Sequence, residues 1–316
     1  MLRGKARPRD EPSKEDGPAL PPVRPDDPAA AAIQAALAIG SHWLGVNQPS
    51  ASRGEEEGVH HLRTTTRRLR SALKLFRPLS DPTWVDDLAE KLKWLADTLG
   101  EVRDLDVLLT RMEAAAREAD VVEALGPLFD GLRARHERAS AALREALASA
   151  RYSELRAVLA GSVGSLPLED GAWEPCRDAL PPLVDDAWTR LKRAARALKR
   201  DDPDDDFHEV RKRAKRARYA AEAVREALGP ALAEDVRRFA RHARKVQDVL
   251  GEHQDAVVAA AEVRRAAAEH PTLGPFNFAA GQLLPREVQN AGDSRRRFFG
   301  VWEGLDRKRV VRWFTS

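Results

Sequence analysis

Apolar residues recur along this chain at the spacing of an α-helix. Leu62, Leu69, Leu73 and Phe76 fall on one stripe when successive residues are turned by about 100°. No stretch alternates between apolar and polar residues, as a half-buried strand would. A second stripe, from residue 210 to 224, consists of Val210, Ala214, Ala217, Ala221 and Val224. The pattern predicts an all-α protein.

Prolines and glycines divide this pattern into separate helices. Asp81 and Pro82 make a good N-cap and first helical residue, and Leu228-Gly229-Pro230 ends one helix before the next begins. We therefore expect eight helices, at about residues 28–46, 59–77, 82–117, 121–159, 182–199, 207–227, 230–268 and 276–305.

The helices at 59–77 and 207–227 each carry a basic face that is separate from the apolar stripe. In a single helix, such a face would be an ordinary solvated surface, and like charges spaced four residues apart repel. Two copies of the face favour an anionic ligand. The first copy contains His60, Arg63, Thr64, Arg67, Ser71 and Lys74, and the second contains His208, Arg211, Lys212, Lys215 and Tyr219, with Arg218 on its flank.

The two basic helices belong to a longer internal repeat. His60 and His208 are 148 positions apart, and Gly100 lies 151 positions before Gly251. Repetition of charged positions at this distance indicates a duplicated unit. The duplication predicts two halves, at residues 29–160 and 175–306. They are flanked by a disordered Pro-rich tail, residues 1–28, and a short basic tail, residues 307–316.

Carboxylates also repeat, on the helix that follows each basic helix. They are spaced at 0, +4 and +7, which places each set on one side of its helix. We expect them to orient the arginines, because partly buried guanidinium groups need bidentate partners. The two sets are Asp97, Glu101 and Asp104, and Asp248, Glu252 and Asp255.

These motifs resemble the CHAD domain, the conserved histidine α-helical domain. The pattern H-x-x-R-x-x-x-[KR]-R-x-R occurs twice, each time followed by L-G-x-x-x-D. The resemblance covers about residues 29–306. It implies two four-helix bundles related by a pseudo-two-fold axis, with a basic cavity between them that binds inorganic polyphosphate. The first half departs from the pattern at Thr64, where the second half has Lys212.

From the resemblance and the helical phase together, we expect a polyphosphate site built from both halves. Two arginines of the helix at 182–199 are included because that helix presents them on one side. The expected binding residues are His60, Arg63, Arg67, Arg70, Lys74, Arg190, Arg193, His208, Arg211, Lys212, Lys215 and Arg218.

Composition narrows the class of protein. Residues 1–28 contain no apolar signal segment, and the apolar run 29–39 is too short to span a membrane. One cysteine cannot form an internal disulfide, which fits a cytoplasmic protein. We therefore expect no membrane association, and the resemblance implies association with polyphosphate granules. The net charge is only +3, so a localised anion site is favoured over a general nucleic-acid coat.

Three functions remain open at this point. The first is non-catalytic binding of polyphosphate, with no catalytic residue, metal or cofactor. The second is metal-dependent hydrolysis of polyphosphate or triphosphate; Glu57-x-x-His60 and Asp205-x-x-His208 have the spacing of a di-metal bundle, but the neighbouring arginines oppose a cation. The third is nucleic-acid binding, which would need aromatic residues along the basic face, where only Tyr219 stands.

Overall fold

The computed structural model describes residue 18 and residues 20–314. This part of the chain is helical, contains two isolated β-bridges and has no strand. The all-α prediction is therefore confirmed. The helices are α1 (Ala29–Ser52), α2 (Glu56–Phe76), η2 (Arg77–Leu79), α3 (Pro82–Glu118), η3 (Glu123–Leu125), α4 (Gly126–Ala148), α5 (Ala150–Gly164), η4 (Asp170–Trp173), α6 (Cys176–Ala197), α7 (Asp204–Val224), α8 (Gly229–Glu269), α9 (Gly274–Leu305) and α10 (Lys308–Val311).

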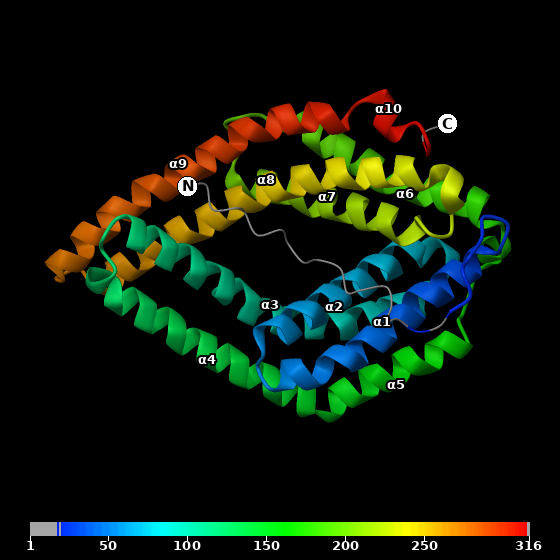
Figure 1. The fold of residues 1–316 in the computed structure, drawn as a ribbon, viewed down its shortest axis with the longest axis horizontal. Helices are drawn as coiled ribbons and strands as arrows, with labels where there is room; N and C mark the ends of the chain where they lie inside the picture. The colour runs from blue at the N-terminus through cyan, green and yellow to red at the C-terminus, as the bar shows by residue number, and fades with distance from the viewer. Residues whose placement is uncertain (1–17, 19, 315–316) are drawn as a thin grey trace, which may run out of the picture.

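Helices α1–α5 form one group and α6–α10 form another. In Figure 1, the second group lies above the first. In the first group, α1 packs on α2 and α5, and α3 packs on α2 and α4. In the second, α7 packs between α6 and α8, and α9 lies along α8. The groups meet where α2 contacts α7 and where α3 contacts α8. The two helices with basic faces therefore lie at the junction.

The apolar stripes form the core. Leu62, Leu69, Leu73 and Phe76 of α2 are all buried, and so is the corresponding stripe of α7. Helix α1 approaches α2 closely at Gly40, where a Cβ would lie 2.2 Å from Cδ2 of Leu69. Burial of one apolar face of each helix leaves its other face available for charge.

Helix α1 extends further than the sequence pattern predicted. It continues through Pro49 to Ser52. Among the described helices, it is the one long and apolar enough to cross a membrane, judged by length and composition alone. Ile33, Leu37 and Leu44 are buried, and the helix packs against α2 and α5. This is the environment of a core helix.

Residues 25–28, which the sequence analysis assigned to a disordered tail, are bound to the start of α6. Cys176 N–H donates to the carbonyl of Asp27 at 2.9 Å, and Arg177 N–H donates to Pro25 at 3.0 Å. Ala29 N–H donates back to Glu174. Residues 1–17 and 19 of the expected tail lie outside the described residues.

Two other helix boundaries differ from the prediction. The expected single helix at 121–159 is broken at Ser149, whose side chain caps α5 by accepting from Tyr152 N–H at 3.2 Å. Helix α6 begins at Cys176, before Pro181 and Pro182, because its first turn is tied to residues 25–27. The expected basic tail is also partly ordered: Val310, Val311 and Phe314 are buried.

Candidate functional site

The basic faces of α2 and α7 meet at the junction of the two groups. Lys215 of α7 lies close enough to Arg67, Arg211 and Arg63 for their charges to act on it. Burial first, and then these three charges, lower the pKa of Lys215 to about 7. We call Arg63, Arg67, Arg211 and Lys215 the central cationic cluster.

Tyr219 borders the cluster. The Arg67 guanidinium lies over its ring at 5.2 Å from the centroid, and that of Arg218 at 4.8 Å. Both are cation–π contacts. The Tyr219 hydroxyl is buried and has no hydrogen-bond partner in the described part of the chain. The sequence analysis named Tyr219 on the basic face but left it out of the binding residues; its phase on that face was the available signal.

Several cations at the junction have buried polar atoms that lack a hydrogen-bond partner among the described residues. They are Nη1 of Arg63, Nε of Arg67, Nε of Arg70 and Nε of Arg211. Nδ1 of His208 is likewise buried and has no hydrogen-bond partner among the described residues. A buried donor without a partner costs about 1–3 kcal/mol, and more when the group is charged. An anion with several acceptor oxygens would remove this cost.

Burial also affects Arg67 and His208. Burial lowers the pKa of Arg67, and the charges of Arg63 and Arg218 lower it further. The phenol of Tyr219 has the opposite effect and raises this pKa. The pKa of His208 is lowered by burial and then by Lys212 and Arg211. Burial is the first cause of both pKa shifts, and neighbouring positive charge adds to each.

A glycine supports one arginine in each half. A Cβ at Gly100 of α3 would lie 3.1 Å from Nη1 of Arg63. A Cβ at Gly251 of α8 would lie 3.5 Å from Nε of Arg211. The absence of a side chain at Gly100 lets the Arg63 guanidinium lie against α3, whereas at Gly251 a Cβ would make an ordinary contact.

Two of the predicted carboxylates reach the cluster. Asp104 accepts a hydrogen bond from Nη2 of Arg63 at 3.0 Å. Asp255 is partly buried near Arg211 and Arg111. Burial raises the pKa of Asp255, and the charge of Asp104 raises it further, whereas the two arginines tend to lower it. One carboxylate from each half therefore borders the cations.

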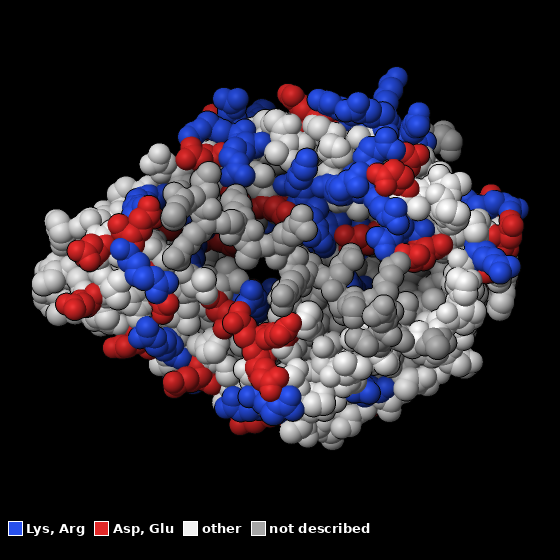
Figure 2. Space-filling view, in the orientation of Figure 1, with Lys and Arg blue, Asp and Glu red and all other residues white. Residues whose placement is uncertain are grey.

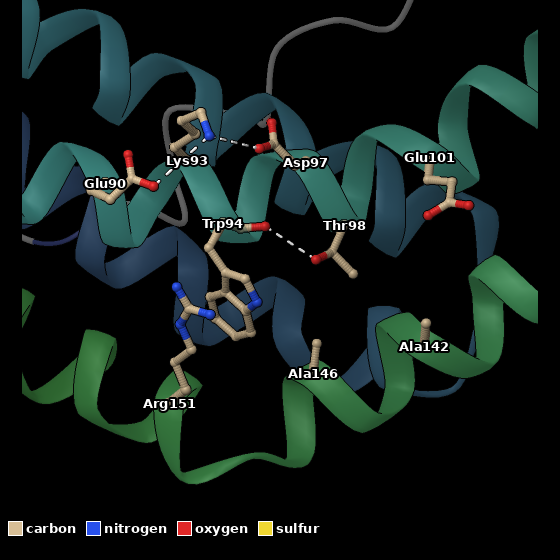
Figure 3. Close-up of a pocket in the computed structure, with 9 residues that line it drawn as sticks. All are labelled: Glu90, Lys93, Trp94, Asp97, Thr98, Glu101, Ala142, Ala146 and Arg151. Atoms are coloured by element: carbon tan, nitrogen blue, oxygen red, sulfur yellow. Dashed lines mark hydrogen bonds and ion pairs between the residues drawn. The ribbon is translucent and has the colours of Figure 1, made fainter.

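Asp97 and Glu101 do not orient the arginines, contrary to the prediction. They line a pocket of about 540 Å³ on another side of α3, facing α4 and α5 (Figure 3). Asp97 pairs with Lys93 of its own helix at 3.4 Å. Helix α3 is in contact with both α2 and α4, so carboxylates of similar phase face different neighbours along its length.

The remaining carboxylates have separate partners. Glu252 pairs with Arg297 of α9 at 2.6 Å, so it holds α8 to α9. Asp248 acts on Arg218. Burial tends to lower the pKa of Arg218, but Glu222, Tyr219 and Asp248 together raise it. Arg218 donates to Glu222 at 2.8 Å and is itself buried, so its charge is already paired.

Arg70 and Lys74 extend the positive charge along α2. The pKa of Lys74 is lowered by burial and then by the charges of Arg216 and Arg70. This places Arg216 of α7 near the end of the α2 basic face. These three cations lie beside the central cluster on the same pair of helices.

The other predicted binding residues have individual surroundings. Lys212 pairs with Glu209 of its own helix, and His60 contacts the ring of His61 at 5.7 Å. Arg190 is exposed and pairs with Asp186 of its own helix at 3.0 Å, and Arg193 is exposed on α6. A role for Arg190 and Arg193 in binding stays a prediction. The described residues contain no group of three or more histidine, cysteine or acidic side chains placed to hold a metal ion.

Comparison with known proteins gives consistent results. The chain resembles the uncharacterized protein Rv2226 of Mycobacterium tuberculosis strain H37Rv, with 31% identity over 265 residues, which is 79% of this chain and 48% of that protein. The chain thus spans about half the length of the curated relatives it matches.

Two solved structures share the fold. PptA from Streptomyces chartreusis superposes with a TM-score of 0.73 at 24% identity, covering 87% of this chain and 99% of PptA. The CHAD domain from the plant Ricinus communis superposes with a TM-score of 0.71 at 26% identity, covering 90% of this chain and 93% of that domain. The family model of the CHAD domain matches residues 32–264. This protein therefore belongs to the CHAD domain family.

Proposed function

We propose that this protein binds inorganic polyphosphate at the central cationic cluster and does not hydrolyse it. The observation that carries the proposal is the set of buried guanidinium atoms of Arg63, Arg67 and Arg211 that have no partner in the described part of the chain. They come from both halves and surround Lys215. Phosphate oxygens are strong acceptors that match the donor geometry of arginine.

A linear phosphate chain fits the arrangement better than a single phosphate. The cations continue from the central cluster to Arg70, Lys74 and Arg216 along α2 and α7. A ligand with an anionic group in each repeating unit can contact all of them at once. The resemblance to the CHAD family, which led us to expect polyphosphate, points to the same ligand.

Nucleic acid fits less well. Binding of single strands uses exposed aromatic rings on which bases stack. The aromatic residue at the cluster is Tyr219, which is buried and contacts Arg67 and Arg218. Because two arginines already cover its ring, a base cannot stack on it, and this favours a ligand without bases.

The positions of the carboxylates favour binding over hydrolysis. A hydrolase needs a base that activates water beside the bound phosphate. Glu101 lies in the pocket that faces α4 (Figure 3). Glu252 pairs with Arg297. Asp104 is engaged by Arg63. None of these three is available for that role without giving up its present surroundings.

The proposal is tested by titrating the protein with long-chain polyphosphate, RNA and nucleoside triphosphates, with and without Mg²⁺. We expect tightest binding to polyphosphate and no release of phosphate. Substituting both Arg211→Ala and Lys215→Ala should abolish this binding and leave the helical circular dichroism spectrum unchanged. Val210 and Ala214, which form the core side of α7, are not altered.

A matched control removes two exposed arginines elsewhere. Arg138 and Arg264 are exposed and belong to α4 and to the last part of α8. The variant Arg138→Ala with Arg264→Ala should bind polyphosphate like the wild type. Equal loss in both variants would refute a localised site, and Mg²⁺-dependent shortening of the polymer would establish the hydrolase.

In the cell, we expect the protein in the cytoplasm at polyphosphate granules. A fluorescent fusion of the wild type should colocalise with the granules, and the fusion carrying Arg211→Ala and Lys215→Ala should be diffuse. Granule association of both fusions would separate targeting from polyphosphate binding.

A further inference from the structure

The C-terminal segment that follows α9 carries a second group of cations. Arg307, Lys308, Arg309 and Arg312 are exposed, as is Lys245 of α8. None of these five has an ion pair with an acid in the part of the chain that the structure describes. We call them the outer cationic surface.

The core fixes this surface in place. Helix α10 packs on α8, with Val310, Val311 and Phe314 buried. The ring of Phe314 lies 5.1 Å from that of Phe239 in α8. The basic residues are therefore held in place by folded structure.

Positive charge from the two helices converges at His242. Its pKa is lowered first by burial and then by the charges of Lys245, Arg241, Arg307 and Arg309. Two nearby acids are already engaged: Glu234 pairs with Arg241 at 2.8 Å, and Asp306 pairs with Arg196 at 2.7 Å. Lys245, Arg307 and Arg309 of the outer surface therefore lie close enough to act together on one side chain.

The outer surface lies on the same group of helices as α7, which supplies Arg211 and Lys215 to the central cluster. Helix α7, which carries Arg211 and Lys215, packs against α8, which carries Lys245. Figure 2 shows Lys and Arg side chains gathered over the upper right of the molecule, above α7, α8 and α10. Because α7 packs directly on α8, a flexible polymer bound at the central cluster can extend over α8 toward the outer surface.

We propose that the outer cationic surface binds a second segment of the same long polyphosphate chain that occupies the central cluster. The inference rests on the proposed function. Membrane binding would need exposed apolar side chains beside the cations, but Val310, Val311 and Phe314 point into the core. Nucleic acid would need exposed rings, but Trp313 packs against Phe314 at 4.6 Å.

Two sites on one polymer give a length-dependent affinity. Once the central cluster holds one segment of the chain, a second segment is at high effective concentration beside the outer cationic surface. The long chain then binds more tightly than either site alone would bind it. Tripolyphosphate has three phosphates, and we expect it to occupy the central cluster alone. The outer surface should therefore affect binding of long chains and leave binding of tripolyphosphate unchanged.

The test compares tripolyphosphate and long-chain polyphosphate on three proteins by titration calorimetry. These are the wild type, the variant Arg307→Gln with Arg309→Gln, and the control Arg138→Gln with Arg264→Gln. We expect the outer variant to bind tripolyphosphate normally and to lose about tenfold or more in affinity for the long chain. The control, which has the same net charge as the outer variant, should match the wild type on both ligands. Unfolding curves check that both variants are folded.

The outcomes separate the two proposals. If the outer variant and the control bind the long chain equally well, the inference fails while the proposed function stands. If the wild type binds neither ligand, the proposed function itself fails. Binding of RNA, or of vesicles of phosphatidylglycerol and phosphatidylcholine, that exceeds binding of long-chain polyphosphate and is lost in the outer variant would overturn the choice of occupant.

Discussion

Lys215 is held in an environment that disfavours its own charge. It is partly buried and lies near Arg67, Arg211 and Arg63, which together with burial lower its pKa to about 7 from a usual value of 10.5. The cost in stability is fully present below pH 7, where Lys215 is charged in both the folded and the unfolded chain. It declines as the pH rises from 7 to 10.5, because the folded protein then carries the neutral amine.

Lys215→Met should therefore stabilise the ligand-free protein most at low pH. We expect its free energy of unfolding to rise by roughly 2 kcal/mol at pH 6, a value reduced for partial exposure, and by little at pH 10. Urea unfolding of both proteins across this range measures the difference. A gain that does not vary with pH would show that packing, and not charge, is responsible.

At the residue scale, helical phase was enough to predict which cations meet. Arg63, Arg67, Arg211 and Lys215 were assigned to one face of their helices, and the structure brings them together. Phase was not enough for Asp97 and Glu101, because it cannot say which neighbouring helix a given side of α3 faces. The paired state of Arg218 was also not predictable, since it depends on Glu222 and Gln247 in three dimensions.

At the scale of the helices, Gly100 and Gly251 are equivalent in sequence but differ in the space around them. A Cβ at Gly251 would make an ordinary contact with Arg211, at 3.5 Å, whereas at Gly100 it would press on Arg63 at 3.1 Å. Gly251→Ala should raise the free energy of unfolding by about 1 kcal/mol, through helix propensity, and leave polyphosphate affinity unchanged. Gly100→Ala should gain less stability and weaken polyphosphate binding, because Arg63 must shift.

Thermal unfolding and polyphosphate titration of the two alanine variants check this difference. Equal affinities for the two variants would contradict the role given to Gly100. If Gly251→Ala is instead destabilising, the close approach of α7 and α8 is tighter than the contact with Arg211 indicates.

Helix ends were predictable where a local cap defines them and less so elsewhere. Asp81 caps α3 by accepting from Trp84 N–H at 2.8 Å, as its place before Pro82 indicated. Ser149 gave a comparable signal for α5, which the sequence analysis did not use. The start of α6 was not predictable, because it depends on hydrogen bonds to residues 25 and 27, about 150 positions earlier in the chain.

At the scale of the whole molecule, ion pairs outside the central cationic cluster also join the two groups of helices. Arg111 of α3 donates through Nε to Glu287 of α9 at 2.9 Å, and Glu287 is buried. Arg135 of α4 donates to the buried Glu262 of α8 at 2.9 Å. The sequence offered no sign of these pairs, since their residues lie outside the repeated motifs. The duplication of the halves itself stays a prediction.

Arg111→Met should destabilise the protein by about 3 kcal/mol, because it leaves the Glu287 carboxylate buried without its partner. Adding Glu287→Leu should recover much of this loss. The exposed pair of Arg286 and Glu118, at 2.7 Å, provides the control, and Arg286→Met should cost less than about 1 kcal/mol. Chemical unfolding measures all three variants. Similar losses for Arg111→Met and Arg286→Met would mean that the buried pair does not hold the groups together.

Polyphosphate binding should depend steeply on salt although the net charge of the chain is only +3. Each phosphate contact releases condensed counterions, so the four cations of the central cluster alone should contribute about −3 to the slope of log affinity against log salt concentration. Arg211→Ala alone should weaken binding and reduce the steepness by about 0.7, whereas Arg138→Ala alone should leave it unchanged. Both variants lower the net charge equally, so this difference separates local contacts from the overall field.

The titrations are run in sodium chloride with and without chelator, and the chelator should have no effect. Loss of binding in chelator would mean that a metal ion bridges the phosphates to Asp104 and Asp255, and a shallow slope in the wild type would place the polymer away from the arginines.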